Sequence, residues 1–216
     1  MLVVYMRLDA AAARYLHSLP ATWAPLAYRA RLARKTSATA RVQSLAGLWL
    51  LQQALTLTGR AAAVLQGIGF SAHDRPRLAD GPAFSISHSA RFAACAITEA
   101  EAGARQVGLD IEEPRPVAPA RMARLLGTDE ERALVAQQPE LFFDYWCARE
   151  ATVKASGRVG LKRIKQVRIE PGKAWLDGRC WALQPLALAP GLCACLACDV
   201  ENEPVRSRCL APTAPS

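Results

Sequence analysis

Gly108-Leu109-Asp110-Ile111-Glu112 is the stretch around which the chain is organised. In an extended strand successive side chains alternate, so Asp110 and Glu112 share one face while Leu109 and Ile111 face a core. Two neighbouring carboxylates repel each other, so they need a cation between them or one must hold a proton. Mg²⁺, a hard cation that prefers oxygen ligands, meets this need. The alternative is an exposed strand end with two solvated acids, and the rest of the sequence must decide.

Length and composition indicate an ordinary folded protein. The 216 residues suffice for one large domain or two lobes, and 51% hydrophobic with 21% charged residues is typical of globular proteins. The apolar start Met1–Met6 is too short for a signal peptide. The apolar region Cys180–Val200 is interrupted by Pro185 and Pro190, so it is no membrane span. We expect a cytoplasmic protein without membrane association.

The seven cysteines are an odd number, which does not favour a disulfide framework. Cys193-x-Cys195-x-x-Cys198 has a spacing that zinc sites use, but its neighbours are apolar and no second ligand pair follows. We interpret these cysteines as buried residues of a core strand.

The net charge of +8 is unevenly distributed. No acidic residue lies between Asp9 and Asp74, and the basic residues there are Arg14, Arg29, Arg31, Arg34, Lys35, Arg41 and Arg60. The front half therefore offers a positive field to nucleic acid, a phosphorylated small molecule or an acidic protein. Coding bias also produces arginine-rich helices, so charge alone does not decide.

The pattern of apolar residues predicts an α+β protein. Strands are predicted at residues 2–8, 84–87, 92–98, 106–112, 167–170, 173–176, 180–183 and 193–199. Helices are predicted at residues 10–18, 26–35, 40–57, 60–66, 118–126 and 140–156, with another after Thr128, whose partner Glu131 completes a capping box. Residues 74–78 read as a turn, and the segment after Glu203 as a loose tail. Each half begins with a strand and ends with paired strands, which segregates strands from helices.

Trp146, Glu150 and Lys154 recur every four residues on the helix at 140–156 and so share a face. Glu150 and Lys154 could form a simple surface salt bridge. With Trp146 on the same stripe the face is partly covered, which favours a ligand or a metal. Glu150 would then add a third carboxylate to Asp110 and Glu112, a set that can hold Mg²⁺ and a diphosphate beside a lysine.

Ser85-Ile86-Ser87-His88-Ser89 is a second polar group, in which the histidine and the hydroxyls can donate to phosphate. No G-x-S-x-G elbow surrounds it and no acid follows closely, so a serine-hydrolase triad fits poorly. No Walker-type or dinucleotide-type glycine loop occurs in the sequence.

Three stretches in order, Phe84-Ser-Ile-Ser-His-Ser89, Val107-Gly-Leu-Asp-Ile-Glu112 and Trp146-Cys-Ala-Arg-Glu-Ala-Thr-Val-Lys-Ala-Ser-Gly157, resemble the signatures of a known family. This family is the 4′-phosphopantetheinyl transferases of the broad-specificity, surfactin-synthetase-activating type, and the resemblance covers nearly the whole chain. It implies a monomeric pseudo-dimer of two similar α+β lobes with the active site in the cleft between them. The expected lobes are residues 1–106, which would bind the phosphates of coenzyme A, and residues 107–216, which would carry the metal site and face the carrier protein.

The resemblance also implies a reaction. With Mg²⁺, or Mn²⁺ in its place, the 4′-phosphopantetheine arm of coenzyme A would pass to a serine of an apo acyl or peptidyl carrier protein. Adenosine 3′,5′-bisphosphate would be released, and the carrier would belong to fatty-acid, polyketide or nonribosomal-peptide biosynthesis. Carried over by position, the metal ligands are Asp110, Glu112 and Glu150, with Glu150 as the base and Lys154 as a diphosphate contact. The coenzyme phosphates would be held by Ser87, His88 and Arg75 and, on looser matching, by Arg31 and Ser44.

The chain departs from the family pattern at Ser85, Gln43 and Arg149, where Asn, Arg and Lys are usual, and Gly157-Arg-Val-Gly160 is one residue longer than the usual glycine-x-glycine. The departures spare the three carboxylates but leave coenzyme affinity and carrier preference open.

Two other classes of function are weighed against the transferase. A magnesium-dependent nuclease or phosphatase would want further Asp or His residues for a second metal, and the histidines are only His17, His73 and His88. A basic nucleic-acid-binding module would interleave aromatic residues with the arginines, but aromatics make up only 6%. We therefore expect no nucleic-acid partner.

Overall fold

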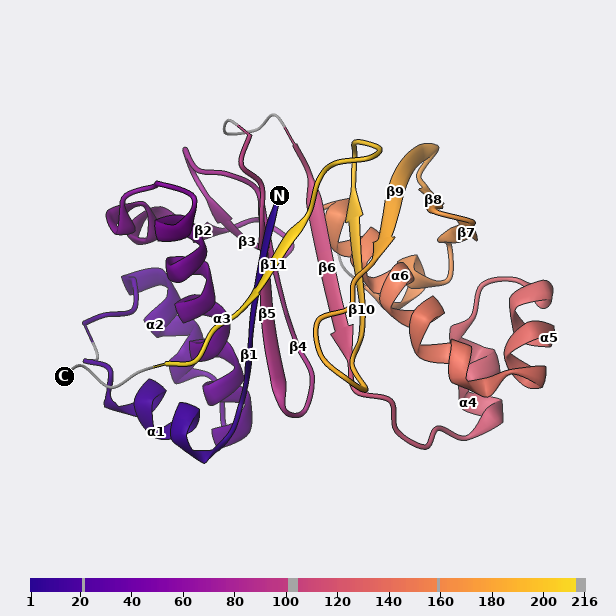
Figure 1. Ribbon diagram of the computed structural model, residues 1–216, viewed down its shortest axis with the longest axis horizontal. Coiled ribbons are helices and arrows are strands. Elements are labelled where there is room, and N and C mark those ends of the chain that lie inside the picture. The colour runs from indigo at the N-terminus through magenta and orange to yellow at the C-terminus, as the bar shows by residue number, and fades with distance from the viewer. Residues whose placement is uncertain (21, 101–104, 159, 213–216) are drawn as a thin grey trace.

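Two β-sheets stand side by side in the middle of the protein, with helices on their outer sides (Figure 1). The computed structural model describes residues 1–20, 22–100, 105–158 and 160–212. The first sheet has the strand order β11-β1-β5-β4 and the second the order β6-β10-β9-β8-β7. The α+β class predicted from the sequence is confirmed, whereas the similarity of two lobes stays a prediction.

The strands of the first sheet are β1 (Leu2–Arg7), β4 (Phe84–His88), β5 (Phe92–Ile97) and β11 (Arg206–Cys209). Those of the second are β6 (Val107–Glu112), β7 (Arg168–Glu170), β8 (Lys173–Leu176), β9 (Arg179–Pro185) and β10 (Cys193–Cys198), and β2 (Ile68–Phe70) pairs with β3 (Pro76–Leu78). The helices of the first half are α1 (Ala10–Ser18), α2 (Leu26–Ala33), α3 (Ala38–Leu57) and the 3₁₀ turn η1 (Ala62–Gly67). The second half has α4 (Pro119–Leu125), α5 (Asp129–Gln137), the 3₁₀ turn η2 (Pro139–Leu141), α6 (Phe142–Ala155) and α7 (Leu161–Ile164).

Local sequence signals start the helices α1 and α5 where they were predicted. The Asp9 carboxylate accepts a hydrogen bond from the backbone N–H of Ala12 at 2.8 Å, which caps α1. Thr128 and Glu131 form the predicted capping box of α5, each side chain accepting from a backbone N–H of the other residue.

The hydrophobic core has separate clusters on the two faces of the first sheet, because successive side chains of a strand point to opposite faces. The even-numbered residues of β1, such as Val4 and Met6, pack with the inner side of α3, while Val3 on the opposite face packs with Leu109 and Ile111 of β6. The first sheet is thus buried on both faces. The second sheet packs α6 on its other side (Figure 1).

Three sequence predictions were wrong. The segment after Glu203 is not loose, because β11 pairs in parallel with β1, with Leu2 opposite Arg206. Residues 74–78 are not all turn, because residues 76–78 form β3 and pair with β2. The strand predicted to end at Ser87 continues to His88, which is the last residue of β4. In each case the strand is stabilised by a partner that is absent from the local pattern.

The cysteines predicted to be core residues lie in β10, where Cys195 and Cys198 are buried and Cys193 is half-buried. Burial raises the pKa of Cys195 to about 12, which keeps it a neutral thiol at physiological pH. Within the described ranges, no helix is both long and apolar enough to cross a membrane.

Gly108 allows α6 to lie directly against β6. A Cβ atom at this position would come within 1.9 Å of the Ala151 carbonyl oxygen and 2.5 Å of the Ala155 nitrogen, and neither backbone atom can yield. We therefore predict that Gly108→Ala lowers the free energy of unfolding by about 3 kcal/mol or more, because the helix must move off the sheet. Urea unfolding followed by circular dichroism measures this change.

The matched control is Gly67→Ala, since a Cβ at Gly67 meets nothing within 4 Å. This variant should unfold within about 0.5 kcal/mol of the parent. A Gly108→Ala protein as stable as Gly67→Ala would contradict the close packing of α6 on β6.

Candidate active site

The two sheets meet where the edge strand β4 lies beside the edge strand β6 (Figure 1). Every second side chain of the Ser85–Ser89 stretch is a serine, and its hydroxyl accepts a backbone N–H from every second residue of the 109–113 stretch. The donors and distances are Leu109 to Ser85 at 2.9 Å, Ile111 to Ser87 at 3.3 Å and Glu113 to Ser89 at 2.8 Å. We call this set the serine ladder. It works because strand side chains and strand edge N–H groups share the same two-residue repeat.

Asp110 and Lys154 form the centre of the site. The Lys154 ammonium, near the end of α6, donates to Asp110 Oδ1 at 2.6 Å and to Ser87 Oγ at 3.0 Å. Ser87 Oγ in turn donates to Asp110 Oδ1 at 2.8 Å. Glu150, one helical turn before Lys154, has Oε2 3.8 Å from the ammonium. The predicted common face of Glu150 and Lys154 is therefore confirmed, and Asp110 is brought to it.

Burial and like charges perturb the ionisation of this cluster. Burial, followed by the negative charge of Asp110, raises the pKa of Glu150 to about 7, although Lys154 opposes the shift and Glu112 adds to it. Burial also acts to lower the pKa of Lys154, but the charges of Asp110 and Glu150 outweigh it and raise that pKa overall. The site therefore holds a charged lysine next to a carboxyl group that titrates near neutral pH.

The carboxylates of Asp110 and Glu150 could bind a further cation, but they do not form a complete metal site by themselves. In the described part of the chain, no three Asp, Glu, His or Cys side chains converge closely enough to hold a metal ion. Yet among those same residues Asp110 Oδ2 is buried and has no hydrogen-bond partner, which leaves an acceptor that a cation would satisfy. The donor set, all carboxylate oxygen, suits Mg²⁺ or Mn²⁺. The assignment of Asp110, Glu112 and Glu150 as metal ligands stays a prediction.

A basic cleft leads to Lys154. Its volume is about 230 Å³, its charged lining residues are Arg31, Asp74, Arg75 and Lys154, and His73 also lines it. Arg31 lies 5.0 Å from the centre of the Phe70 ring and pairs with Asp74 Oδ2 at 2.5 Å. Because this pair is half-exposed, an incoming phosphate could take the place of Asp74 on the guanidinium at small cost.

Arg75 links the two halves of the protein at the floor of the basic cleft. Its guanidinium donates to the Val107 carbonyl oxygen at 2.9 Å and to that of Ala155 at 3.5 Å. Burial lowers the pKa of Arg75, but two carbonyl partners and the high intrinsic value keep it charged. A phosphate in the cleft would thus meet two arginines and one lysine.

The other predicted phosphate contacts lie outside the cleft lining. Ser44 is buried within α3. His88 is the last residue of β4, and its pKa is lowered by desolvation and by the charges of Lys154 and Lys35. The Ser87 hydroxyl already donates to Asp110. Their roles in coenzyme binding stay predictions.

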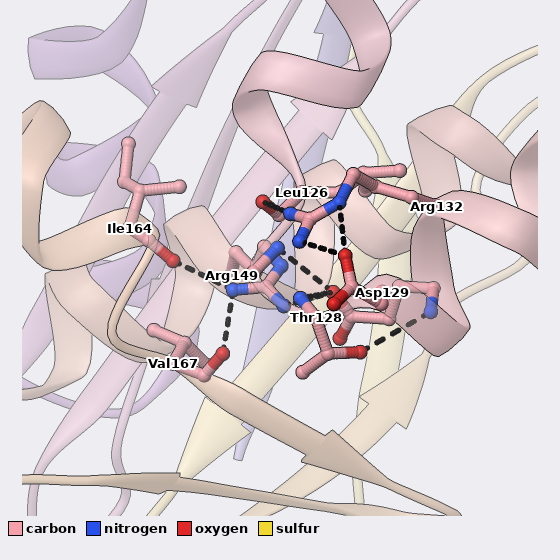
Figure 2. Close-up of polar contacts among 9 residues, drawn as sticks. Leu126, Thr128, Asp129, Arg132, Arg149, Ile164 and Val167 are labelled. Carbon is pink, nitrogen blue, oxygen red and sulfur yellow. Dashed lines mark hydrogen bonds and ion pairs between the residues drawn. The ribbon is translucent and has the colours of Figure 1, made fainter.

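The departures from the family pattern at Arg149, Ser85 and Gln43 make structural contacts. Arg149 is fully buried, forms an ion pair with Glu131 and donates to the carbonyl oxygens of Ile164 at 2.7 Å and Val167 at 2.5 Å (Figure 2). Arg149 therefore links α6 to α5 and to the end of α7, and it does not line the basic cleft.

Ser85 belongs to the serine ladder, and Gln43 Nε2 donates to the Ser89 carbonyl oxygen at 2.9 Å, which fixes α3 to the end of β4. Sequence reasoning missed these contacts, although the alternation of serines with apolar residues at 84–89 was a signal that one polar face is buried. It also missed His73, which stands in a turn without any pattern of its own.

The comparisons with known proteins agree with this geometry. Residues 106–180, which carry all three carboxylates and Lys154, match the model of the 4′-phosphopantetheinyl transferase superfamily. The chain is 30% identical over 120 residues to the 4′-phosphopantetheinyl transferase HetI of Nostoc sp., covering 48% of this chain and 48% of that protein. It is 33% identical over 100 residues to the 4′-phosphopantetheinyl transferase psf-1 of Bacillus pumilus, covering 43% of this chain and 41% of that protein.

Over the matched segments the chain is similar to the 4′-phosphopantetheinyl transferases. The matched segments span about half the length of these relatives.

The raised pKa of Glu150 has a consequence for stability. Between pH 4.5, the ordinary pKa, and about pH 7, the unfolded chain ionises Glu150 while the folded protein still holds the proton. The folded protein therefore loses stability as pH rises through that window. We predict that Glu150→Gln, which stays neutral, gains up to about 3 kcal/mol relative to the parent between pH 4.5 and pH 8. Urea unfolding in EDTA at several pH values measures the difference.

The control Glu140→Gln replaces an exposed glutamate of η2 and should change the free energy of unfolding little at any pH between 4.5 and 8. A difference between Glu150→Gln and the parent that does not grow with pH would show that Glu150 is not destabilised by its neighbours.

Proposed function

We propose that the protein is a 4′-phosphopantetheinyl transferase of the broad-specificity, surfactin-synthetase-activating type. It would transfer the 4′-phosphopantetheine arm of coenzyme A to a serine of an apo acyl or peptidyl carrier protein in the cytoplasm and release adenosine 3′,5′-bisphosphate. One observation carries the proposal: Lys154, which lines the basic cleft, contacts Asp110 and lies next to Glu150. A lysine that can bind an anion and a glutamate that can act as a base therefore lie next to each other.

The chemistry assigns a role to each of these side chains. The carrier serine Oγ attacks the phosphorus that bears pantetheine, and the bond from that phosphorus to the bridging diphosphate oxygen breaks. Glu150 accepts the serine proton, a role that a carboxylate next to Lys154 and Asp110 can fill. Lys154 contacts the diphosphate and stabilises the charge on the departing adenosine bisphosphate.

A magnesium or manganese ion held by Asp110, Glu112 and Glu150 would neutralise charge on the diphosphate. Arg31 and Arg75 would bind the remaining phosphates of coenzyme A. Ser44, Ser87 and His88 belong to the proposal as further phosphate contacts. The charge distribution supports this placement, because the basic cleft opens in the half that has no acidic residue between Asp9 and Asp74.

A groove next to Glu112 supports a carrier protein as the partner. It has a volume of about 460 Å³, and its lining includes Phe142, Phe143, Trp146 and the 61% exposed Leu161, with Arg115 and Arg121 among them. An acidic helical domain with an apolar face would match an apolar floor with arginines at its side. Its serine could then reach Glu150, one helical turn from Trp146 on α6.

The test combines purified protein, coenzyme A, Mg²⁺ and apo carriers of the fatty-acid, polyketide and nonribosomal-peptide types, read by intact mass. We expect at least one carrier to gain the phosphopantetheine arm. If none gains it, with Mg²⁺ or with Mn²⁺, the transferase proposal fails, and degradation of nucleic acid or hydrolysis of phosphate esters by the same preparation would favour a nuclease or phosphatase instead.

Glu150→Gln should lower the transfer rate by at least about a hundredfold, because it removes the proton acceptor while keeping the shape of the side chain. Asp110→Ala should lose activity together with the dependence on Mg²⁺. Glu140→Gln, on the exposed η2 turn, serves as the control and should transfer at the parental rate. Normal turnover by Glu150→Gln would remove Glu150 from the mechanism.

A further inference from the structure

The serine ladder joins the two sheets through three hydroxyl groups, all of them buried: Ser85, Ser87 and Ser89 are 6%, 4% and 7% exposed. β6 is an edge strand, so the N–H groups on its open edge need acceptors from outside its own sheet. The hydroxyls provide them at the positions 109, 111 and 113. This contact alone would give the serines a purely structural role.

Two of the three serines also contact a carboxylate of β6. Ser87 donates to Asp110 Oδ1 at 2.8 Å, and Ser89 donates to Glu112 Oε2 at 3.3 Å. A serine hydroxyl has one proton and two lone pairs, so it can accept from a backbone N–H and donate to a carboxylate at once. For Ser85 the described residues show only the backbone contact with Leu109. The ladder therefore contains its own matched comparison.

Glu112 is held by donors on one of its two oxygens. Ser89 Oγ and Arg115 Nη1, the latter at 2.8 Å, both contact Oε2. The Arg115 guanidinium also lies 5.4 Å from the centre of the Phe143 ring, a cation–π contact that favours this position of the side chain. Two donors on Oε2 fix the plane of the carboxylate and leave the lone pairs of Oε1 to face another cation.

We propose that Ser89 is a positioning residue, which reaches across from the first sheet to orient Glu112 for binding a divalent cation. The inference rests on the proposed function in taking Glu112 as a metal ligand, and it adds Ser89, which neither the family resemblance nor the basic cleft assigns. A hydroxyl that fixes a ligating carboxylate typically changes metal affinity by ten- to a hundredfold when it is removed.

The experiment compares Ser89→Ala with Ser85→Ala in the full chain, by electron paramagnetic resonance titration with Mn²⁺. Each variant removes one acceptor from a buried backbone N–H, that of Leu109 in β6 or that of Glu113 directly after it, so both should lose similar stability. We expect Ser89→Ala to weaken Mn²⁺ binding about tenfold, Ser85→Ala to stay within about twofold of the parent, and Ser89→Thr, which keeps the hydroxyl, to recover most of the affinity.

Equal Mn²⁺ dissociation constants for Ser89→Ala and Ser85→Ala would overturn the inference and leave Ser89 as a ladder residue only. Absence of Mn²⁺ binding by the parent protein would overturn it as well. If an alanine variant fails to fold, Ser89→Cys and Ser85→Cys replace the pair, because a thiol of similar size donates only weakly. Failure of the proposed function is separate, since it is read from the parent protein and carriers by intact mass.

Discussion

The serine ladder between β4 and β6 is the interaction on which the rest of the structure depends. It satisfies the open edge of β6 without merging the two sheets, because side-chain hydroxyls replace the backbone acceptors of a neighbouring strand. It also sets the register between the halves, since a slip by one residue would turn Ile86 toward β6 and expose the serines to the core beneath α3. The position of Asp110 relative to the basic cleft follows from this register.

Both halves of the protein place charged side chains where the two sheets meet. The first half brings Arg31 and Arg75 to the cleft, and the second brings Asp110 and Glu150 to Lys154. Partial burial strengthens each interaction and makes the excess of carboxylates costly, as the raised pKa of Glu150 reflects. A ligand that carries a diphosphate together with a divalent cation would relieve both imbalances, which is the physical basis of the proposed activity.

Signals within a few residues of each other could be read from the sequence. The strand at 107–112, the capping box at Thr128 and the shared face of Glu150 and Lys154 are examples, because strand alternation, capping and helical spacing are local properties. The pairing of β11 with β1 could not be read, since its partner lies about 200 residues away. The burial of Arg149 and of the serines was hidden for the same reason: a polar side chain is placed by its partners.

The most direct test of the account is a crystal structure of the protein with coenzyme A and Mn²⁺, in which anomalous scattering locates the metal. The account predicts an anomalous peak next to Asp110 Oδ2, with the carboxylates of Glu112 and Glu150 also beside it. The diphosphate should lie between that peak and the arginines of the basic cleft. A metal bound elsewhere, or a coenzyme diphosphate that leaves Lys154 and Asp110 without contact to it, would contradict the account.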